Sequence, residues 1–183
     1  GIHDVKVICV EGQLTDHYNP MDKTVNLSQE VYHGRNAAAT AVAAHECGHA
    51  VQHATAYSFL QLRSAMVPIQ NVSGQILNFV MMGMMFGAFF AQSMLPWKMA
   101  LLIIIACYGV FALFALITLP VEFDASKRAL AWIDDRGIVT RQEHDMAKDA
   151  LKWAAMTYVV AAIGAVTTLV YYIMMYLGAN RDE

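Results

Sequence analysis

Three long stretches of this chain contain no Asp, Glu, Lys or Arg, and they limit what it can fold into. They run over residues 64–97, 99–121 and 154–180. A helix needs about 20 apolar residues to cross a hydrocarbon core of about 30 Å, and each stretch is long enough. The alternative, a soluble bundle, would require three helices that are apolar on every side in a small protein. We therefore expect three transmembrane helices, near Val72–Leu95, Met99–Leu119 and Ala155–Leu177.

The composition supports a membrane protein and excludes other classes. Hydrophobic residues make up 57% of the 183 residues, charged residues make up 15%, and the mean hydropathy is +0.41. The formal net charge of −3 and the lack of a basic stripe predict no nucleic-acid partner. The three cysteines lie far apart, so we expect no disulfide framework and a reducing compartment. Because the chain begins with Gly1 rather than Met, we expect a processed form or a fragment.

The first polar segment predicts a short sheet followed by helices. Asp4–Val10 alternates and is rich in β-branched residues, which predicts a strand. Leu14–Tyr18 and Thr24–Leu27 are two further strands that can pair across a turn. Ser28–Tyr32 predicts a short helix, and the Ala-rich run Asn36–Tyr57 predicts a longer one.

The second polar segment, residues 122–152, predicts two helices. Ala and Leu recur at helical spacing over Ala125–Trp132, and Gly137 ends that helix. Thr140 followed by Glu143 forms a capping box that begins the next helix, which continues into the third apolar stretch.

The Asn36–Tyr57 helix contains an H-E-x-x-H motif, His45-Glu46-Cys47-Gly48-His49. Residues four apart share one face of a helix, so both imidazoles can bind one metal ion. Glu46 lies one residue round the helix, where its carboxylate can take a proton from a water without binding the metal. This is the arrangement of a zinc hydrolase. Two incidental histidines on a surface helix are disfavoured, because chance produces the motif in about one such chain in a hundred.

Two histidines and a water leave zinc one protein ligand short. His53 is on the same face as His45 but about 12 Å further along the helix axis, so the two rings cannot bind one ion together with His49. We therefore expect His53 to be a polar residue beside the site or to contact the substrate. Glu122 is better placed, because a carboxylate at the edge of an apolar span is costly unless paired or bound to a cation. Asp124 is the second candidate for the third ligand. If Asp124 does not bind the metal, either it or Ser126 can accept a hydrogen bond from the ring nitrogen of a zinc-bound histidine that faces away from the metal. Two other histidines are less well placed, His17 and His144.

The layout predicts four parts on two sides of a membrane. The first part, residues 1–63, is a cytoplasmic catalytic part, and the second, residues 64–119, is a transmembrane hairpin. The third part, residues 120–153, is a cytoplasmic helical part that carries the third ligand. The fourth part, residues 154–183, contains the third span and a tail. A hairpin leaves both polar parts on one side. That side holds ten of the twelve Lys and Arg, all except Lys98 and Arg181. The positive-inside rule therefore places the motif in the cytoplasm.

Three sequence blocks resemble the bacterial neutral zinc metallopeptidases of the YugP type, which are related in outline to the gluzincins. The blocks cover residues 14–20, 42–53 and 119–126 in that order, and the resemblance extends over nearly the whole chain. Together with the three spans and the short N-terminal sheet predicted above, it gives a mainly α membrane protein with three transmembrane helices and a small α+β zincin-like catalytic part. It also implies a further span upstream of Gly1.

The resemblance assigns roles to four residues. His45, His49 and Glu122 are implied as ligands of one Zn²⁺ per chain, and Glu46 as the general base of a membrane endopeptidase. Gluzincins often carry an Asp four residues after the ligand Glu. Ser126 occupies that position here, so the residues that surround the metal ligands depart from the family pattern.

Our hypothesis is peptide-bond hydrolysis by a multi-pass protein of the bacterial inner membrane, at its cytoplasmic interface. The implied partners are the lipid bilayer and a peptide or membrane-protein substrate, and no oligomeric state is predicted. The strand Thr24–Leu27 is expected to pair with an extended substrate. Hydrolysis places negative charge on the oxygen of the scissile carbonyl, and this oxyanion needs a further hydrogen-bond donor besides zinc. The candidates are not ranked: Tyr57, His53, Arg128 and His144.

Three rival functions make different demands on the sequence. A non-catalytic membrane scaffold stabilised by zinc would need four protein ligands and no Glu46. A site-2-type intramembrane protease would carry the motif inside a span, whereas Arg35 and Arg63 flank this helix. A zinc transporter would need ionisable residues within the spans, and the three stretches contain no charged residue.

Overall fold

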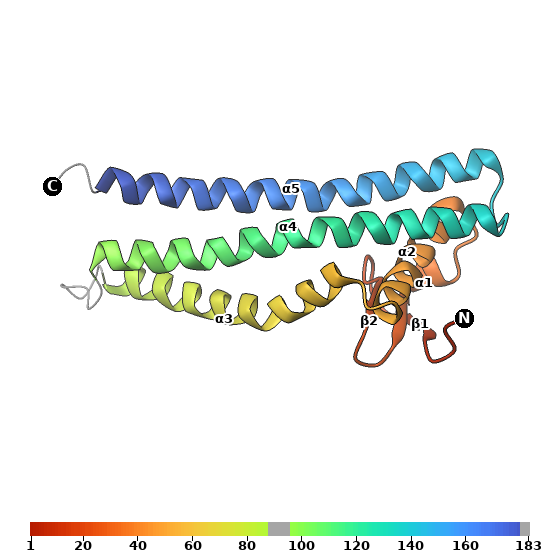
Figure 1. Ribbon diagram of the computed structural model, residues 1–183, viewed down its shortest axis with the longest axis horizontal. Coiled ribbons are helices and arrows are strands. Elements are labelled where there is room, and N and C mark those ends of the chain that lie inside the picture. The colour runs from red at the N-terminus through yellow and green to blue at the C-terminus, as the bar shows by residue number, and fades with distance from the viewer. Residues whose placement is uncertain (88–95, 180–183) are drawn as a thin grey trace. The chain divides into compact units, whose positions relative to one another are not determined.

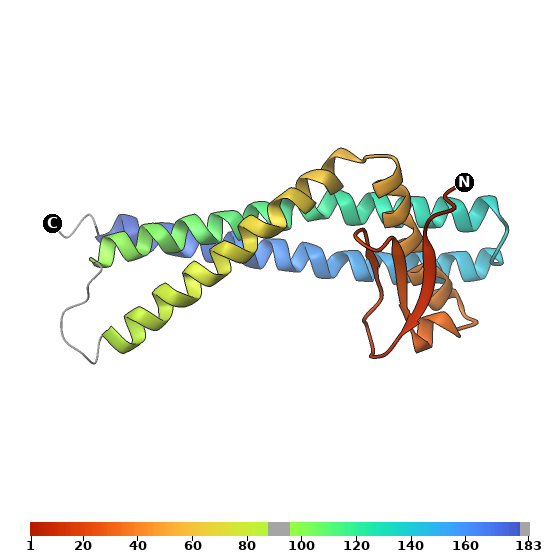
Figure 2. The ribbon, with the colours of Figure 1, turned by 90° about the horizontal axis from the view of Figure 1, so that it is seen from below.

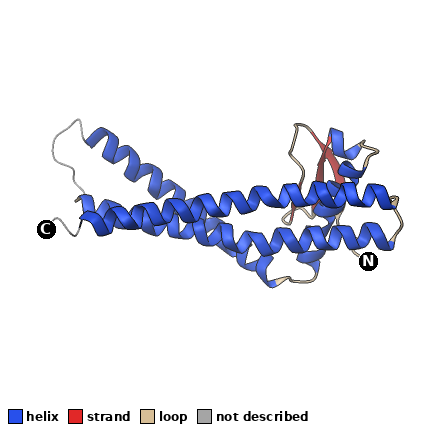
Figure 3. Cartoon of the chain, turned by 90° about the horizontal axis from the view of Figure 1, so that it is seen from above, coloured by secondary structure: helices blue, strands red, loops and turns tan. Residues whose placement is uncertain are grey.

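The computed structural model describes residues 1–87 and 96–179, and Figure 1 labels the helices and strands. The strands are β1 (Lys6–Val10), β2 (His17–Asn19) and β3 (Thr24–Ser28). The helices are α1 (Gln29–Tyr32), α2 (Ala37–Ala54), α3 (Ser58–Gly87), α4 (Trp97–Asp135) and α5 (Arg141–Ala179). The described chain is therefore mostly helical with one small N-terminal sheet (Figure 3), as the sequence predicts.

The chain divides into two compact units. The first consists of Gly1–Gln61 and Thr118–Tyr158, and the second of Leu62–Ile117 and Val159–Glu183. The sheet, α1, α2 and the polar ends of α4 and α5 all belong to the first unit.

The sheet of the first unit has the order β1-β3-β2, so β3 is its central strand (Figure 2). β1 runs parallel to β3 and β2 runs antiparallel to it. Our expectation that β3 accepts an extended substrate is therefore wrong, because both of its edges are already paired. The second predicted strand, Leu14–Tyr18, is observed as His17–Asn19. Leu14 has a φ of 56° and is 96% exposed, so the chain turns there instead of extending.

The predicted motif helix corresponds to α2, and local hydrogen bonds set both of its ends. Asn36 is the N-cap, and its side-chain oxygen accepts from the backbone nitrogen of Ala39 at 2.9 Å. At the other end Ala56 has a φ of 52°, and the backbone nitrogen of Tyr57 donates to the carbonyl of Gln52 at 2.9 Å. This closing turn ends α2 at Ala54, three residues before the predicted end.

Two faces of α2 pack inside the first unit. One packs on the sheet, where Ala50 joins Val25 and Leu27 of β3 in a small core. The other packs on α4 and α5 in a second core of small and branched residues. That core contains Ala41, Ala44, Ala129, Ile133, Ala147 and Leu151.

α2 and α4 touch at the level of their backbones. A Cβ on Gly48 would lie 2.7 Å from the carbonyl oxygen of Ala125 and 3.2 Å from its Cα. Real Cβ atoms essentially never come so close to backbone, so only glycine allows this approach. Gly48 is the second variable position of the H-E-x-x-H motif, and it therefore has a packing role that the motif does not specify.

α4 is one continuous helix through Pro120, although the sequence predicts a span that ends at Leu119 and a separate helix from Ala125. A proline removes one intrahelical hydrogen bond and kinks a helix without always ending it. Burial of Ile117 and Val121 on either side favours the helix through this point.

The predicted capping box at the start of α5 is confirmed. The backbone nitrogen of Thr140 donates to Oε2 of Glu143 at 2.8 Å, and that of Glu143 donates to Oγ1 of Thr140 at 3.3 Å. Gly137, with a φ of 59°, stands at the predicted break between α4 and α5.

Two described helices, α4 and α5, are long and apolar enough to cross a membrane, not the three that we predict. The first predicted span, Val72–Leu95, is not among them. Asn71, Gln75 and Asn78 interrupt the apolar surface of α3, and residues 88–95 lie outside the described residues. The tail that carries Arg181 lies outside them as well.

Ring and small-residue contacts join the helices of the second unit. Tyr108 of α4 stacks on Tyr172 of α5, with ring centroids 5.1 Å apart. A Cβ on Gly74 of α3 would lie 3.9 Å from the ring of Phe111, which is ordinary van der Waals contact. Leu101 and Ile104 of α4 are fully buried.

We predict that Gly48→Ala destabilises the protein. Alanine normally favours a helix over glycine by about 1 kcal/mol. Here its Cβ meets the Ala125 backbone, so we expect α2 and α4 to separate at a cost of about 1–3 kcal/mol. Thermal unfolding in detergent, followed by circular dichroism, measures the change.

Cys47→Ala is the matched control for this substitution. Cys47 is the neighbouring residue of the same helical turn, but its side chain is exposed. Unfolding of Gly48→Ala at the same temperature as the wild type and Cys47→Ala would show that the close approach is not required.

Candidate metal centre

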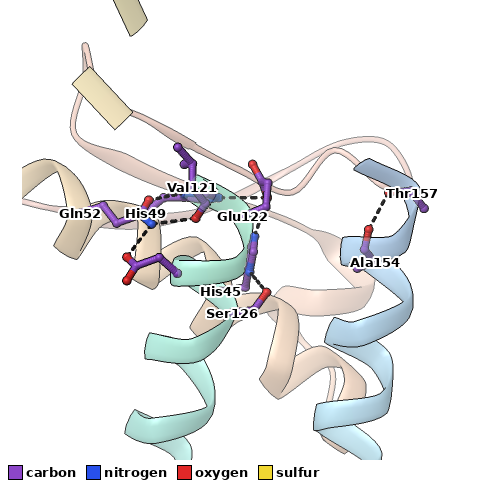
Figure 4. Close-up of polar contacts among 9 residues, drawn as sticks. His45, His49, Gln52, Val121, Glu122, Ser126, Ala154 and Thr157 are labelled. Carbon is purple, nitrogen blue, oxygen red and sulfur yellow. Dashed lines mark hydrogen bonds and ion pairs between the residues drawn. The ribbon is translucent and has the colours of Figure 1, made fainter. Parts of the chain in front are cut away.

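Three side chains from α2 and α4 converge in the first unit: His45, His49 and Glu122 (Figure 4). Their candidate ligand atoms all lie within 4.8 Å of one another. Oε2 of Glu122 is 3.2 Å from Nε2 of His45 and 3.6 Å from Nε2 of His49. The structure thus brings together the three residues that the sequence predicts as ligands.

The backbone arrangement explains how these side chains meet. His45 and His49 are one helical turn apart, and their rings lie edge to face with centroids 4.7 Å apart. Glu122 lies three residues before Ala125, the residue that α2 approaches at Gly48. The close backbone contact therefore brings the Glu122 carboxylate up to the two imidazoles.

The outer nitrogen of each histidine also has a partner. Nδ1 of His45 lies 3.1 Å from Oγ of Ser126, and Nδ1 of His49 lies 3.0 Å from Oε1 of Gln52. The sequence predicts Asp124 or Ser126 for this role, and Ser126 is the one in direct contact with a ring. These contacts fix the rotation of both rings so that each Nε2 faces Glu122.

Gln52 is the site residue that sequence reasoning missed. It is fully buried, and its Nε2 donates to the carbonyl of Val121 and to Oδ2 of Asp124, each at 2.8 Å. Because the amide nitrogen makes both of these bonds, the amide oxygen faces His49 and accepts a hydrogen bond from Nδ1–H of that ring. The sequence feature that could have identified Gln52 is its spacing, because a residue three positions after His49 lies on the same face of the helix.

This arrangement demands a positive charge between the histidines and Glu122. A neutral His49 with its proton on Nδ1 points the Nε2 lone pair at a carboxylate oxygen, which is repulsive unless a cation or a proton lies between them. Burial opposes a charged ring at His49, but the Glu122 and Glu46 carboxylates and Gln52 raise its pKa overall. Glu122 is only 2% exposed, and a carboxylate buried to that degree needs a cationic partner.

Glu46 lies next to this cluster without belonging to it. Its carboxylate is buried, and burial raises its pKa even though His49 and His45 nearby lower it. A backbone interaction with Tyr18 in β2 also lowers the pKa of Glu46. A buried carboxyl group whose pKa is raised is a suitable proton acceptor and donor near neutral pH.

The other predicted residues lie around the cluster but outside it. Asp124, the second candidate ligand, instead accepts from Gln52 and from Nε of Arg128 at 2.6 Å. Nδ1 of His53 lies 2.8 Å from the hydroxyl of Tyr18. The guanidinium of Arg128 stacks over the ring of Tyr57, 5.9 Å from its centroid. Among the described residues, neither His17 nor His144 joins a metal-binding group with these three ligands.

The donor set fits zinc. Two imidazole nitrogens and one carboxylate oxygen form a common protein ligand set for catalytic zinc, which keeps the fourth position open. Outer partners that orient the ligating rings, here Ser126 and Gln52, are typical of such sites. The same geometry offers a harder ion such as Mg²⁺ fewer oxygen ligands than it prefers.

Comparisons with known proteins identify the family of this chain. A family model described as "Putative neutral zinc metallopeptidase" matches residues 1–177. The protein named "Putative membrane protease YugP" of Bacillus subtilis (strain 168) is 40% identical over 186 residues, which cover 100% of this chain and 77% of that protein. No solved structure matches the chain, so the zincin-like part of the predicted fold stays a prediction. The family resemblance is confirmed, and the chain belongs to the neutral zinc metallopeptidase family.

Proposed function

We propose that this chain is a membrane-bound zinc endopeptidase that hydrolyses peptide bonds at the cytoplasmic face of a bacterial inner membrane. One observation carries the proposal: the Nε2 atoms of His45 and His49 both face one buried oxygen of Glu122. The Glu46 carboxylate lies beside them and remains outside the ligand group.

The chain's own residues account for proton transfer. One zinc ion per chain, held by His45, His49 and Glu122, would supply a Lewis acid that polarises the scissile carbonyl and acidifies a water. Glu46 accepts a proton from the attacking water and delivers it to the leaving amine. Its raised pKa makes the protonated form accessible between these two transfers. Gln52 and Ser126 keep the imidazoles in their ligating orientation.

The edge strand β2 is the best place for an extended substrate. β2 pairs with β3 on one side only, and the backbone of Tyr18 in β2 is close enough to lower the pKa of Glu46. A peptide added to this edge would run past the proposed base, and backbone hydrogen bonds would bind it without regard to sequence. We propose peptide segments of membrane proteins as the substrates.

The membrane location rests on the two apolar helices and on charge. α4 and α5 are long enough to cross a membrane, and the B. subtilis relative is named a membrane protease. We propose a multi-pass protein whose site faces the cytoplasm, because nine of its twelve Lys and Arg belong to the first unit, which contains the motif.

Two alternatives fit the site less well. A zinc-stabilised scaffold needs a fourth protein ligand, and the metal-binding group found among the described residues has three members. A site-2-type protease carries its motif in a membrane span, whereas α2 is not one of the candidate spans.

We predict that Glu46→Gln abolishes proteolysis and retains zinc. Glutamine keeps the shape of the side chain but cannot take a proton, and loss of a general base lowers a rate by about 10²–10⁴-fold. The measurement is casein cleavage by the detergent-purified chain, with zinc quantified in the same samples by elemental analysis.

Glu30→Gln serves as the control, because Glu30 is an exposed carboxylate of α1. Cleavage by Glu46→Gln at the wild-type rate would contradict the base role. Zinc without cleavage in the wild type would favour the scaffold.

We predict that Gln52→Leu weakens zinc binding about 10–100-fold, the usual effect of losing a partner of a ligating histidine. Leucine has a similar size, but it leaves Nδ1 of His49 and Oδ2 of Asp124 without this partner. Competition with a chromophoric zinc chelator measures the affinity.

Gln142→Leu is the matched control, because Gln142 is exposed in the first turn of α5. If Gln52→Leu and Gln142→Leu bind zinc equally tightly, Gln52 does not orient His49.

A further inference from the structure

A groove between α4 and α5 in the first unit is not used by the proposed chemistry. It is an open groove with a volume of about 360 Å³, which is within the size range of ligand sites. Its lining is mostly apolar, and Leu130, Leu151, Ala155 and Met156 contribute to it. An occupant therefore needs a hydrocarbon portion.

Three lysines are the charged residues that line this groove: Lys127 on α4, and Lys148 and Lys152 on α5. All three are exposed, and no acidic side chain lines the groove with them. Within the described residues, no carboxylate forms an ion pair with any of the three. The groove therefore combines an apolar wall with three exposed lysines that form no ion pair with a described residue, although Lys127 also interacts electrostatically with Asp124 of α4. This combination complements an anionic amphiphile.

The groove also lies where the apolar stretches of α4 and α5 end. Lys127 is six residues after Val121 and Lys148 is six before Ala154, or about 9 Å along each helix. Lys152 is closer still, and its ammonium lies 5.8 Å from the ring centroid of Trp153. Exposed Trp and Lys at the end of an apolar helix are typical of the headgroup level of a membrane.

We propose that this groove binds an anionic phospholipid, with the phosphate among Lys127, Lys148 and Lys152 and an acyl chain along the apolar wall. The lipid is an integral ligand of the protein, distinct from the peptide substrate. Ser126, which contacts His45, also borders the groove, so the lipid would lie next to the residue that orients a zinc ligand.

Lipid binding to the full chain in detergent tests the proposal without an activity assay. Native mass spectrometry and thermal unfolding are measured with dioleoylphosphatidylglycerol, dioleoylphosphatidylcholine or soluble glycerol 3-phosphate. We expect phosphatidylglycerol to bind at least about tenfold more tightly than phosphatidylcholine, because each lysine near an anionic headgroup contributes about fivefold in affinity. We expect no stabilisation by glycerol 3-phosphate, which lacks acyl chains.

The decisive variant replaces all three lysines by glutamine, Lys127→Gln/Lys148→Gln/Lys152→Gln, and leaves Ser126 unchanged. We expect it to lose the preference for phosphatidylglycerol. The control removes the same charge from exposed positions that do not line the groove, Lys6→Gln/Arg136→Gln/Arg141→Gln, and should keep the preference.

A second variant, Ala155→Leu, narrows the groove without changing charge, and it should also lose lipid. The proposal is overturned if the lysine variant keeps its preference, or if the control loses as much. Equal stabilisation by glycerol 3-phosphate would assign the lysines to a free phosphate instead of a lipid. If Ala155→Leu is unfolded even in the absence of lipid, its loss of lipid binding is uninformative. The lysine variant and its control then test the proposal by themselves.

Discussion

The distance between α2 and α4 is the constraint on which the rest of the site depends. At Gly48 the two backbones come so close that a Cβ would lie 2.7 Å from the Ala125 carbonyl oxygen. His45 and His49 flank Gly48 on one helix, and Glu122 lies one turn from Ala125 on the other. A single backbone contact therefore sets how far the carboxylate stands from the two imidazoles. Alanines on both helices extend this contact through the neighbouring core.

The same two helices also carry the partners that orient the ligands. Ser126 follows Glu122 by one turn of α4, and Gln52 follows His49 by one turn of α2. Gln52 then bonds back to α4 through Val121 and Asp124, so it links the two helices at the level of the site. Ligand orientation and helix packing are thus one set of interactions, and a change in either alters the other. The sheet also influences the site, because the backbone of Tyr18 in β2 lowers the pKa of Glu46.

Features that depend on local spacing are the ones that the sequence predicts best. The helical period places His45 and His49 on one face, and the cost of a carboxylate at the edge of an apolar stretch singles out Glu122. The capping box at Thr140 and Glu143 is equally local. Pairing between distant strands is harder to predict from the sequence. Nothing in the residues Thr24–Leu27 indicates that they form the central strand of the sheet. Gln52 was missed because its partners lie about 70 positions away on α4 and meet it only after folding.

The position of Glu122 along α4 connects the site with the membrane. It is the first charged residue after the uncharged stretch 99–121, so a helix that buries this stretch in lipid must place Glu122 at the interface. α2 has no such stretch and is held at that level by α4. Under the proposed location, the reacting peptide bond must therefore lie close to the bilayer surface. This geometry favours the ends of membrane spans over folded cytoplasmic domains as substrates.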